Sequence, residues 1–131
     1  MFRGLVERYL PYKFNTESHV SYTPDGYILK IFRVLPESAD PQDFSRPVAF
    51  IQHGLLNTAE NWVGSKEYSL ASKMIEEGYD VWLGNSRGNL YSRGHLVMDP
   101  ERDSKYSQFS FYEMGIYDIP SMIDYVRNYT G

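Results

Sequence analysis

The sequence predicts an α/β fold in which a β-hairpin precedes a strand–helix–strand unit and a long kinked helix. Three observations favour this fold. A Pro-Asp-Gly turn separates two stretches of β-forming residues, two short apolar runs lack the alternation of half-exposed strands, and a helix with its own capping signal follows them. The 131 residues have the length of a single domain.

The N-terminal part of the chain is predicted to form a short helix and then the hairpin. Residues 2–10 place their apolar side chains on one helical face, and Pro11 ends that helix. Residues 18–23 and 27–35 are rich in β-forming side chains and flank the turn at 24–26.

The middle of the chain is predicted to form a βαβ unit, after a polar surface loop over 36–46. The apolar run at 48–51 is typical of a strand buried on both faces of a parallel sheet. A helix around 66–77 is capped by Gly78, and a second buried strand follows at 81–83. This order predicts parallel pairing with a right-handed crossover. The apolar stripe of the helix is expected to be Leu70, Ala71, Met74 and Ile75.

The last helix is expected to follow a loop over 89–108. Ser110 and Glu113 have the spacing of a capping box, and the helix continues to about residue 129. Pro120 lies inside it and should kink it, because proline lacks an N–H and crowds the preceding turn. Its core stripe is predicted to be Ile119, Met122, Ile123 and Val126.

Composition excludes several classes of protein. The net charge is −4 and no basic run is present, which argues against nucleic-acid binding. The absence of cysteine rules out disulfides and thiolate metal sites, and the histidines lack ligand spacing, so no metal or cofactor is expected. No apolar stretch is long enough to span a membrane. Charges at Glu7 and Arg8 argue against a signal peptide, and the compartment stays open.

Residues 84–88 read Gly-Asn-Ser-Arg-Gly and match G-x-S-x-G, the nucleophile elbow of many serine hydrolases. A buried strand leads into this segment, as an elbow requires. However, residues 89–100 have no helical period, and the only later histidine, His95, precedes every later aspartate, whereas the triad order is Ser, acid, His. We therefore interpret Ser86 as part of a glycine-rich loop at the carboxyl end of a parallel strand. A minimal hydrolase with Ser86 as its nucleophile stays as an alternative.

His53-Gly54-Leu55 directly follows the first apolar run. In acyl transfer, backbone N–H groups positioned beforehand stabilise the oxyanion, and HG-type motifs after a strand supply one of them. Glycine would let the backbone turn so that the Leu55 amide points at the substrate. His53 is expected to pack and hydrogen-bond within the loop rather than to be catalytic. An ordinary β–α turn is the alternative interpretation.

Four ordered segments together resemble a known family. They are YTPDGYIL (22–29), RPVAFIQHGLLNTAENWV (46–63), GYDVWLGNSRGNLYSR (78–93) and FSFYEMGIYDIPSMIDYV (109–126). They are similar to the acid lipases, the gastric and lysosomal lipase family of the α/β-hydrolase fold. The resemblance begins at about residue 2 and includes the partial lipase region of that fold.

The resemblance implies a fold of eight mostly parallel strands flanked by helices. It also implies hydrolysis of neutral lipid esters, triacylglycerols and cholesteryl esters, through a serine triad and an acyl-enzyme. By position, Leu55 matches the leucine whose amide lines the oxyanion hole, supported by His53 and Gly54. The segment that contains Ser86 matches a loop that is not the nucleophile elbow of the family.

The resemblance further implies that residues 1–131 form one incomplete α/β-hydrolase domain. Residues from about 1 to 45 would be the lipase-associated helix and hairpin, and residues from about 46 to 131 the start of the parallel sheet. The strand that carries the nucleophile, the acid and the histidine would then lie beyond residue 131, so no catalytic residue is expected within the chain. The alternative is a short non-catalytic relative that binds lipid or pairs with a partner chain, which could donate the missing strand.

Overall fold

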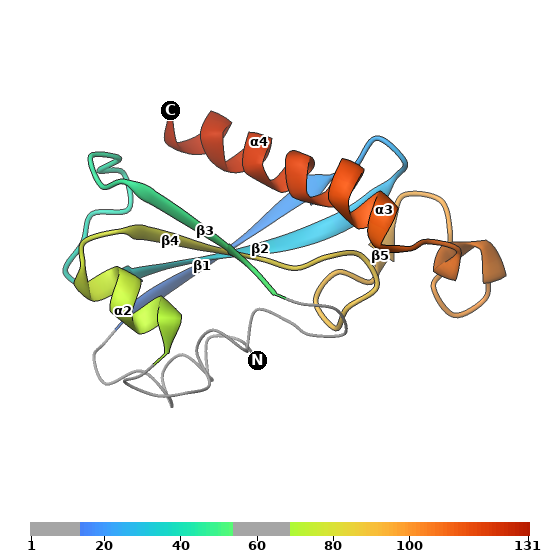
Figure 1. Ribbon diagram of the computed structural model, residues 1–131, viewed down its shortest axis with the longest axis horizontal. Coiled ribbons are helices and arrows are strands. Elements are labelled where there is room, and N and C mark those ends of the chain that lie inside the picture. The colour runs from blue at the N-terminus through green and yellow to red at the C-terminus, as the bar shows by residue number, and fades with distance from the viewer. Residues whose placement is uncertain (1–13, 54–68) are drawn as a thin grey trace.

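A computed structural model describes residues 14–53 and 69–131. The helix predicted over 2–10 therefore lies outside the described residues. Figure 1 shows a twisted sheet with the long helix α4 (Ile119–Thr130) across one face and the short helix α2 (Leu70–Glu76) against the other. This arrangement is the mixed α/β architecture that the sequence predicts.

The hairpin is confirmed. Strands β1 (Phe14–Tyr22) and β2 (Tyr27–Pro36) pair antiparallel along their whole length. The turn between them needs Gly26, which has a φ of +92° that side chains with a Cβ rarely adopt. A Cβ at this glycine would also lie 2.8 Å from a ring carbon of His95.

The parallel unit is confirmed, with a correction to its burial. Strands β3 (Val48–Gln52) and β4 (Asp80–Gly84) pair in parallel, and the sheet order is β1-β2-β4-β3. Every residue of β4 is buried, as predicted. The prediction that β3 is buried on both faces is wrong, because β3 is the edge strand of the described sheet and Val48 is 39% exposed.

Helix α2 ends as predicted, with Gly78 in a positive-φ conformation and its N–H donating to the Ile75 carbonyl. Its buried side differs from the predicted stripe. Leu70 in the first turn is 45% exposed, whereas Ser72 is buried together with Ala71 and Ile75.

Strand alternation divides the core into two clusters, one on each face of the sheet. The α2 face holds Phe32, Val34, Ala49, Ala71, Ile75, Val81 and Leu83. The α4 face holds Tyr27, Leu29, Ile31, Trp82, Tyr106, Met122 and Val126. Neighbouring residues of β2 and β4 thus point to opposite clusters, and both strands form the centre of the molecule.

The C-terminal helical segment has three parts, α3 (Phe111–Glu113), the π-helical turn η4 (Met114–Asp118) and α4. The capping box of Ser110 and Glu113 is confirmed. Pro120 lies in the first turn of α4, where its missing N–H is tolerated, and the wider π-helical turn directly precedes it. Met122 and Val126 are buried as predicted, but Ile123 is 38% exposed and is not part of the core.

The expected loop over 89–108 contains two short elements. Strand β5 (Gly94–His95) pairs with the start of β2, and the 3₁₀ turn η3 (Ser104–Ser107) follows. The described helices include none long and apolar enough to cross a membrane.

We predict that Gly84→Ala lowers the free energy of unfolding by about 1–3 kcal/mol, because overpacking a filled core forces neighbours out of place. A Cβ at this position would lie 2.5 Å from the Gln52 Oε1 atom and 2.7 Å from the Phe50 ring. Urea denaturation measures the change. Gly115→Ala is the matched control, since a Cβ there meets nothing within 4 Å. Equal effects of the two substitutions would contradict the packing argument.

We also predict that the Glu113 carboxylate titrates below its usual range. Hydrogen bonds from the Ser110 hydroxyl and backbone N–H, at 2.8 and 2.7 Å, lower the pKa of Glu113. The stabilisation is therefore present at neutral pH and is lost as the pH falls through this lowered pKa. An NMR titration measures it, with Ser110→Ala expected to raise the pKa and Ser110→Thr to preserve it.

Candidate functional site

The candidate site lies where the parallel strands β3 and β4 end. Gln52 and Gly84 are paired at the carboxyl ends of these strands, so the segments that follow them start side by side. Ligands of open α/β sheets bind at this edge. The site is built from His53 after β3 and from residues 85–89 after β4.

Ser86 is buried, with 6% of its surface exposed, and its two polar groups have different partners. Its hydroxyl accepts a hydrogen bond of 2.9 Å from the Gln52 side-chain amide. Its backbone N–H donates to the His53 Nε2 atom at 3.0 Å. The imidazole thus meets the backbone of Ser86, while the hydroxyl that a nucleophile would need is held by Gln52.

Arg87, next to Ser86, carries a buried charge that is fully paired. Its guanidinium forms a two-point ion pair with Asp25, at 2.6 and 2.9 Å, and contacts Asp118 at 2.8 and 2.9 Å. Asp118 also accepts the Arg87 backbone N–H. The guanidinium lies 4.0 Å from the centre of the Tyr27 ring, which adds a cation–π contact. We call Asp25, Tyr27, Arg87 and Asp118 the Arg87 cluster.

The charges of the Arg87 cluster shift each other's pKa values. Burial by itself would lower the pKa of Arg87, but the hydrogen bonds with Asp25 and Asp118 outweigh burial and raise it. For Asp118 burial is the larger effect, and it raises the pKa against the opposing influence of Arg87. The two ion pairs of Arg87 thus connect the segment after β4 to the hairpin turn and to the C-terminal helical segment.

Both glycine positions of the G-x-S-x-G segment require glycine for structural reasons. Gly84 lets the Gln52 side chain and the Phe50 ring pack directly on the β4 backbone. Gly88 has a φ of +78°, and a Cβ there would lie 2.7 Å from the Phe109 ring. The spacing that resembles a nucleophile elbow is thus required by turn geometry and close packing.

The structure brings together some of the sequence-predicted residues and adds others. His53 and Ser86 meet, whereas Gly54 and Leu55 lie outside the described residues. Sequence reasoning missed the two asparagines of the same segment, Asn85 and Asn89, which also hydrogen-bond within the site. Polar side chains placed directly after a buried strand were the available signal for them.

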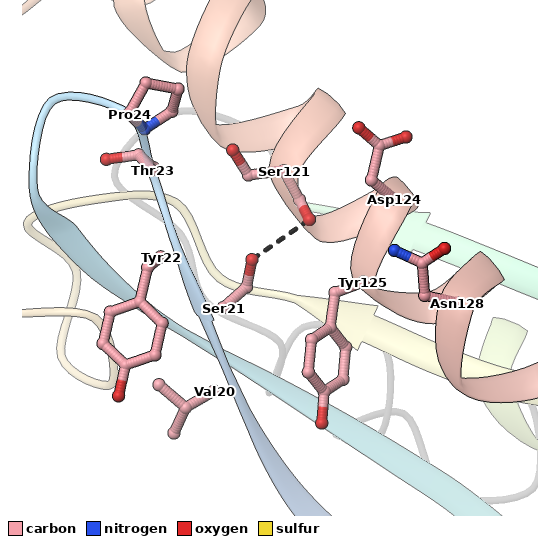
Figure 2. Close-up of a pocket in the computed structure, with 9 residues that line it drawn as sticks. All are labelled: Val20, Ser21, Tyr22, Thr23, Pro24, Ser121, Asp124, Tyr125 and Asn128. Atoms are coloured by element: carbon pink, nitrogen blue, oxygen red, sulfur yellow. Dashed lines mark hydrogen bonds between the residues drawn. The ribbon is translucent and has the colours of Figure 1, made fainter.

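Over residues 14–53 and 69–131, no three His, Asp or Glu side chains form a metal-binding group. A hollow of about 530 Å³ lies between β1 and α4. Figure 2 shows its lining residues, among them Ser21, whose hydroxyl donates to the Ser121 carbonyl. That hydrogen bond measures 3.0 Å. The residues around His53 do not line this hollow.

Comparison with known proteins relates this chain to lipases. Residues 5–66 match the family described as a partial alpha/beta-hydrolase lipase region. The chain is 44% identical over 119 residues to gastric triacylglycerol lipase of Bos taurus, covering 88% of this chain and 30% of the relative. It is 42% identical over 121 residues to Lipase 1 of Drosophila melanogaster, covering 92% and 26%. Human gastric triacylglycerol lipase is 43% identical over 117 residues, covering 88% and 29%.

The chain therefore spans less than a third of the length of these relatives and corresponds to their N-terminal region.

We predict that Arg87→Met lowers the free energy of unfolding by about 3–5 kcal/mol, because Asp118 is left buried without its partner. Adding Asp118→Asn should restore part of this loss, since the variant then buries no unpaired charge. Urea denaturation of the two single variants and the double variant gives the coupling energy. Additive effects would contradict the proposed pairing.

Proposed function

Because this chain belongs to the acid lipase family, with gastric lipase-like relatives, we propose that its gene product hydrolyses neutral lipid esters. The substrates are carboxylic esters such as triacylglycerols and cholesteryl esters, and the mechanism uses a serine acyl-enzyme. The observation that carries this proposal is the 44% identity to a gastric triacylglycerol lipase over 119 residues.

Residues 1–131 form the start of an α/β-hydrolase domain in this proposal, with residues 1–45 as its N-terminal helix and hairpin and residues 46–131 as the first part of its parallel sheet. The order β1-β2-β4-β3 leaves β3 at the edge of the described sheet, which supports the proposal. The strand before the nucleophile would pair with this edge. It would further cover the partly buried Phe50 and Ile51 and remove an edge that would otherwise promote aggregation.

The chain contributes the oxyanion loop, which supplies one amide of the oxyanion hole. The Leu55 backbone N–H donates to the tetrahedral oxyanion, and Gly54 lets the backbone turn toward the substrate. His53 lies at the carboxyl edge of the sheet, directly after β3, where such a loop must begin. Its contact with the Ser86 backbone supports this placement.

The catalytic serine comes from sequence outside these 131 residues, and Ser86 has a structural role. The contact of the Ser86 hydroxyl with Gln52 and of its N–H with His53 supports this assignment. So does its burial, because a nucleophile must reach the ester carbon of its substrate.

A fluorophosphonate probe tests the location of the nucleophile. We predict that the full-length gene product is labelled, and that mass spectrometry of its peptides places the adduct on a serine other than Ser86. Ser86→Ala should leave labelling and turnover of a short-chain ester intact. An adduct on Ser86 would overturn the proposal in favour of a minimal hydrolase. No adduct together with no turnover would favour a non-catalytic relative that binds lipid or a strand-donating partner.

Substitution of Leu55 tests the oxyanion hole. Leu55→Pro removes the backbone N–H and should lower kcat about 100-fold or more, which is the typical effect of losing one oxyanion donor. Leu55→Ala keeps the N–H and is the matched control, so its kcat should stay close to that of the wild type. Equal losses in both variants would show that the side chain matters and the amide does not.

A further inference from the structure

We propose that His53 is a positioning residue, held as the neutral Nδ1–H tautomer by the segment after β4. Three residues of that segment take part: Asn85, Ser86 and Asn89. Together with His53 we call them the His53 network. The network aims the chain as it leaves β3, directly before the proposed oxyanion amide.

The tautomer follows from an unambiguous donor. A backbone N–H can only donate, and that of Ser86 points at the His53 Nε2 atom at 3.0 Å. Nε2 must therefore offer its lone pair, which places the proton of the neutral ring on Nδ1. In a charged imidazolium Nε2 also carries a proton, so two donors would face each other and the hydrogen bond with the Ser86 N–H would be lost.

The Asn89 side chain supports the same tautomer, and backbone groups fix its orientation. Its Oδ1 atom accepts the N–H groups of Tyr91 and Ser92 at 2.9 and 3.0 Å. Its amide nitrogen must then face the other way, where it lies 3.1 Å from the His53 Nε2 atom. Two donors therefore converge on one ring nitrogen.

The network continues into the centre of the sheet. The Asn89 amide also donates to the Asn85 Oδ1 atom at 3.0 Å, and the Asn85 amide donates to the Lys30 carbonyl of β2 at 3.2 Å. Asn85 has no exposed surface. A backbone group fixes the orientation of each of the two asparagine amides. The hydrogen bonds of the His53 network therefore connect His53 to the buried strand β2.

The positioning role rests on the proposed function, since it concerns the oxyanion loop of a lipase. The network itself does not, because it consists of described hydrogen bonds. An effect on catalysis follows from geometry: a displacement of about 1 Å at an oxyanion donor can lower turnover about 100-fold.

NMR of the full-length gene product tests the tautomer. Long-range proton–nitrogen correlation spectra at neutral pH should show His53 with an unprotonated Nε2 and a protonated Nδ1. A proton on Nε2, in either a neutral or a charged ring, would overturn the proposal. This readout does not depend on turnover, so it remains decisive even if the gene product hydrolyses no ester.

Asn89→Asp is the sharpest variant. Its carboxylate still accepts the Tyr91 and Ser92 N–H groups, so the turn is kept, but it places an acceptor where His53 needs a donor. We expect a proton to move to Nε2 and kcat to fall about 10- to 100-fold, with KM within about twofold. Leu90→Ala is the control in the same loop, because the Leu90 side chain is 58% exposed and, being apolar, cannot take part in the hydrogen bonds of the His53 network.

A second pair of variants applies if Asn89→Asp does not fold. His53→Gln places a carbonyl oxygen near the position of Nε2 and can still accept, so it should keep most of the activity. His53→Leu cannot accept and should lose about 10- to 100-fold in kcat. If His53→Gln is as inactive as His53→Leu, or if Leu90→Ala is as impaired as Asn89→Asp, the positioning role is wrong. If the wild type itself has no turnover, the proposed function has failed and the NMR result alone decides the network.

Discussion

The arrangement of the described segments depends most on the ion pairs of the buried Arg87 guanidinium. Asp25 of the hairpin turn and Asp118 of the C-terminal helical segment both bind it, although they are far apart in the sequence. Taking the charges of Arg87 and Asp118 out of water is expensive, and the cost is offset here by short, multiple hydrogen bonds and by the Tyr27 ring. The segment after β4 is therefore anchored, within the candidate site, to both the hairpin turn and the C-terminal helical segment.

A second buried arginine secures the opposite end of β4. Arg33 of β2 has no exposed surface and forms a two-point ion pair with Asp80, the first residue of β4, at 2.8 Å for both contacts. Glu17 of β1 adds a third charge at 3.2 Å. Strand β4 thus begins at one ionic cluster and is followed by another. Removing either arginine would leave a buried aspartate, Asp80 or Asp118, without its main partner, which is costly.

The G-x-S-x-G segment has a different structural role from the nucleophile elbow that its spacing suggests. In a nucleophile elbow the glycines allow a strained turn that exposes the serine. Here Gly84 allows close packing on β4, Gly88 adopts a positive φ, and the serine is turned inward to Gln52. The same pattern of small residues therefore serves a loop that supports its neighbour. Its backbone N–H and two asparagines hold His53, the last described residue before the proposed oxyanion loop.

The sequence by itself determined the local elements and the family. The Pro-Asp-Gly turn, the Ser110 capping box and the buried strand β4 depend on residues within a few positions of one another, and all three are present in the structure. Only the tertiary structure decided which polar groups meet. The edge position of β3, the exposed side of α4 at Ile123, and the contacts of His53 and Asp118 all follow from the order of strands in the sheet. Hydrogen bonds between segments separated by 30 or so residues leave no periodic signal in either segment, because each partner is chosen by the fold and not by its neighbours in sequence.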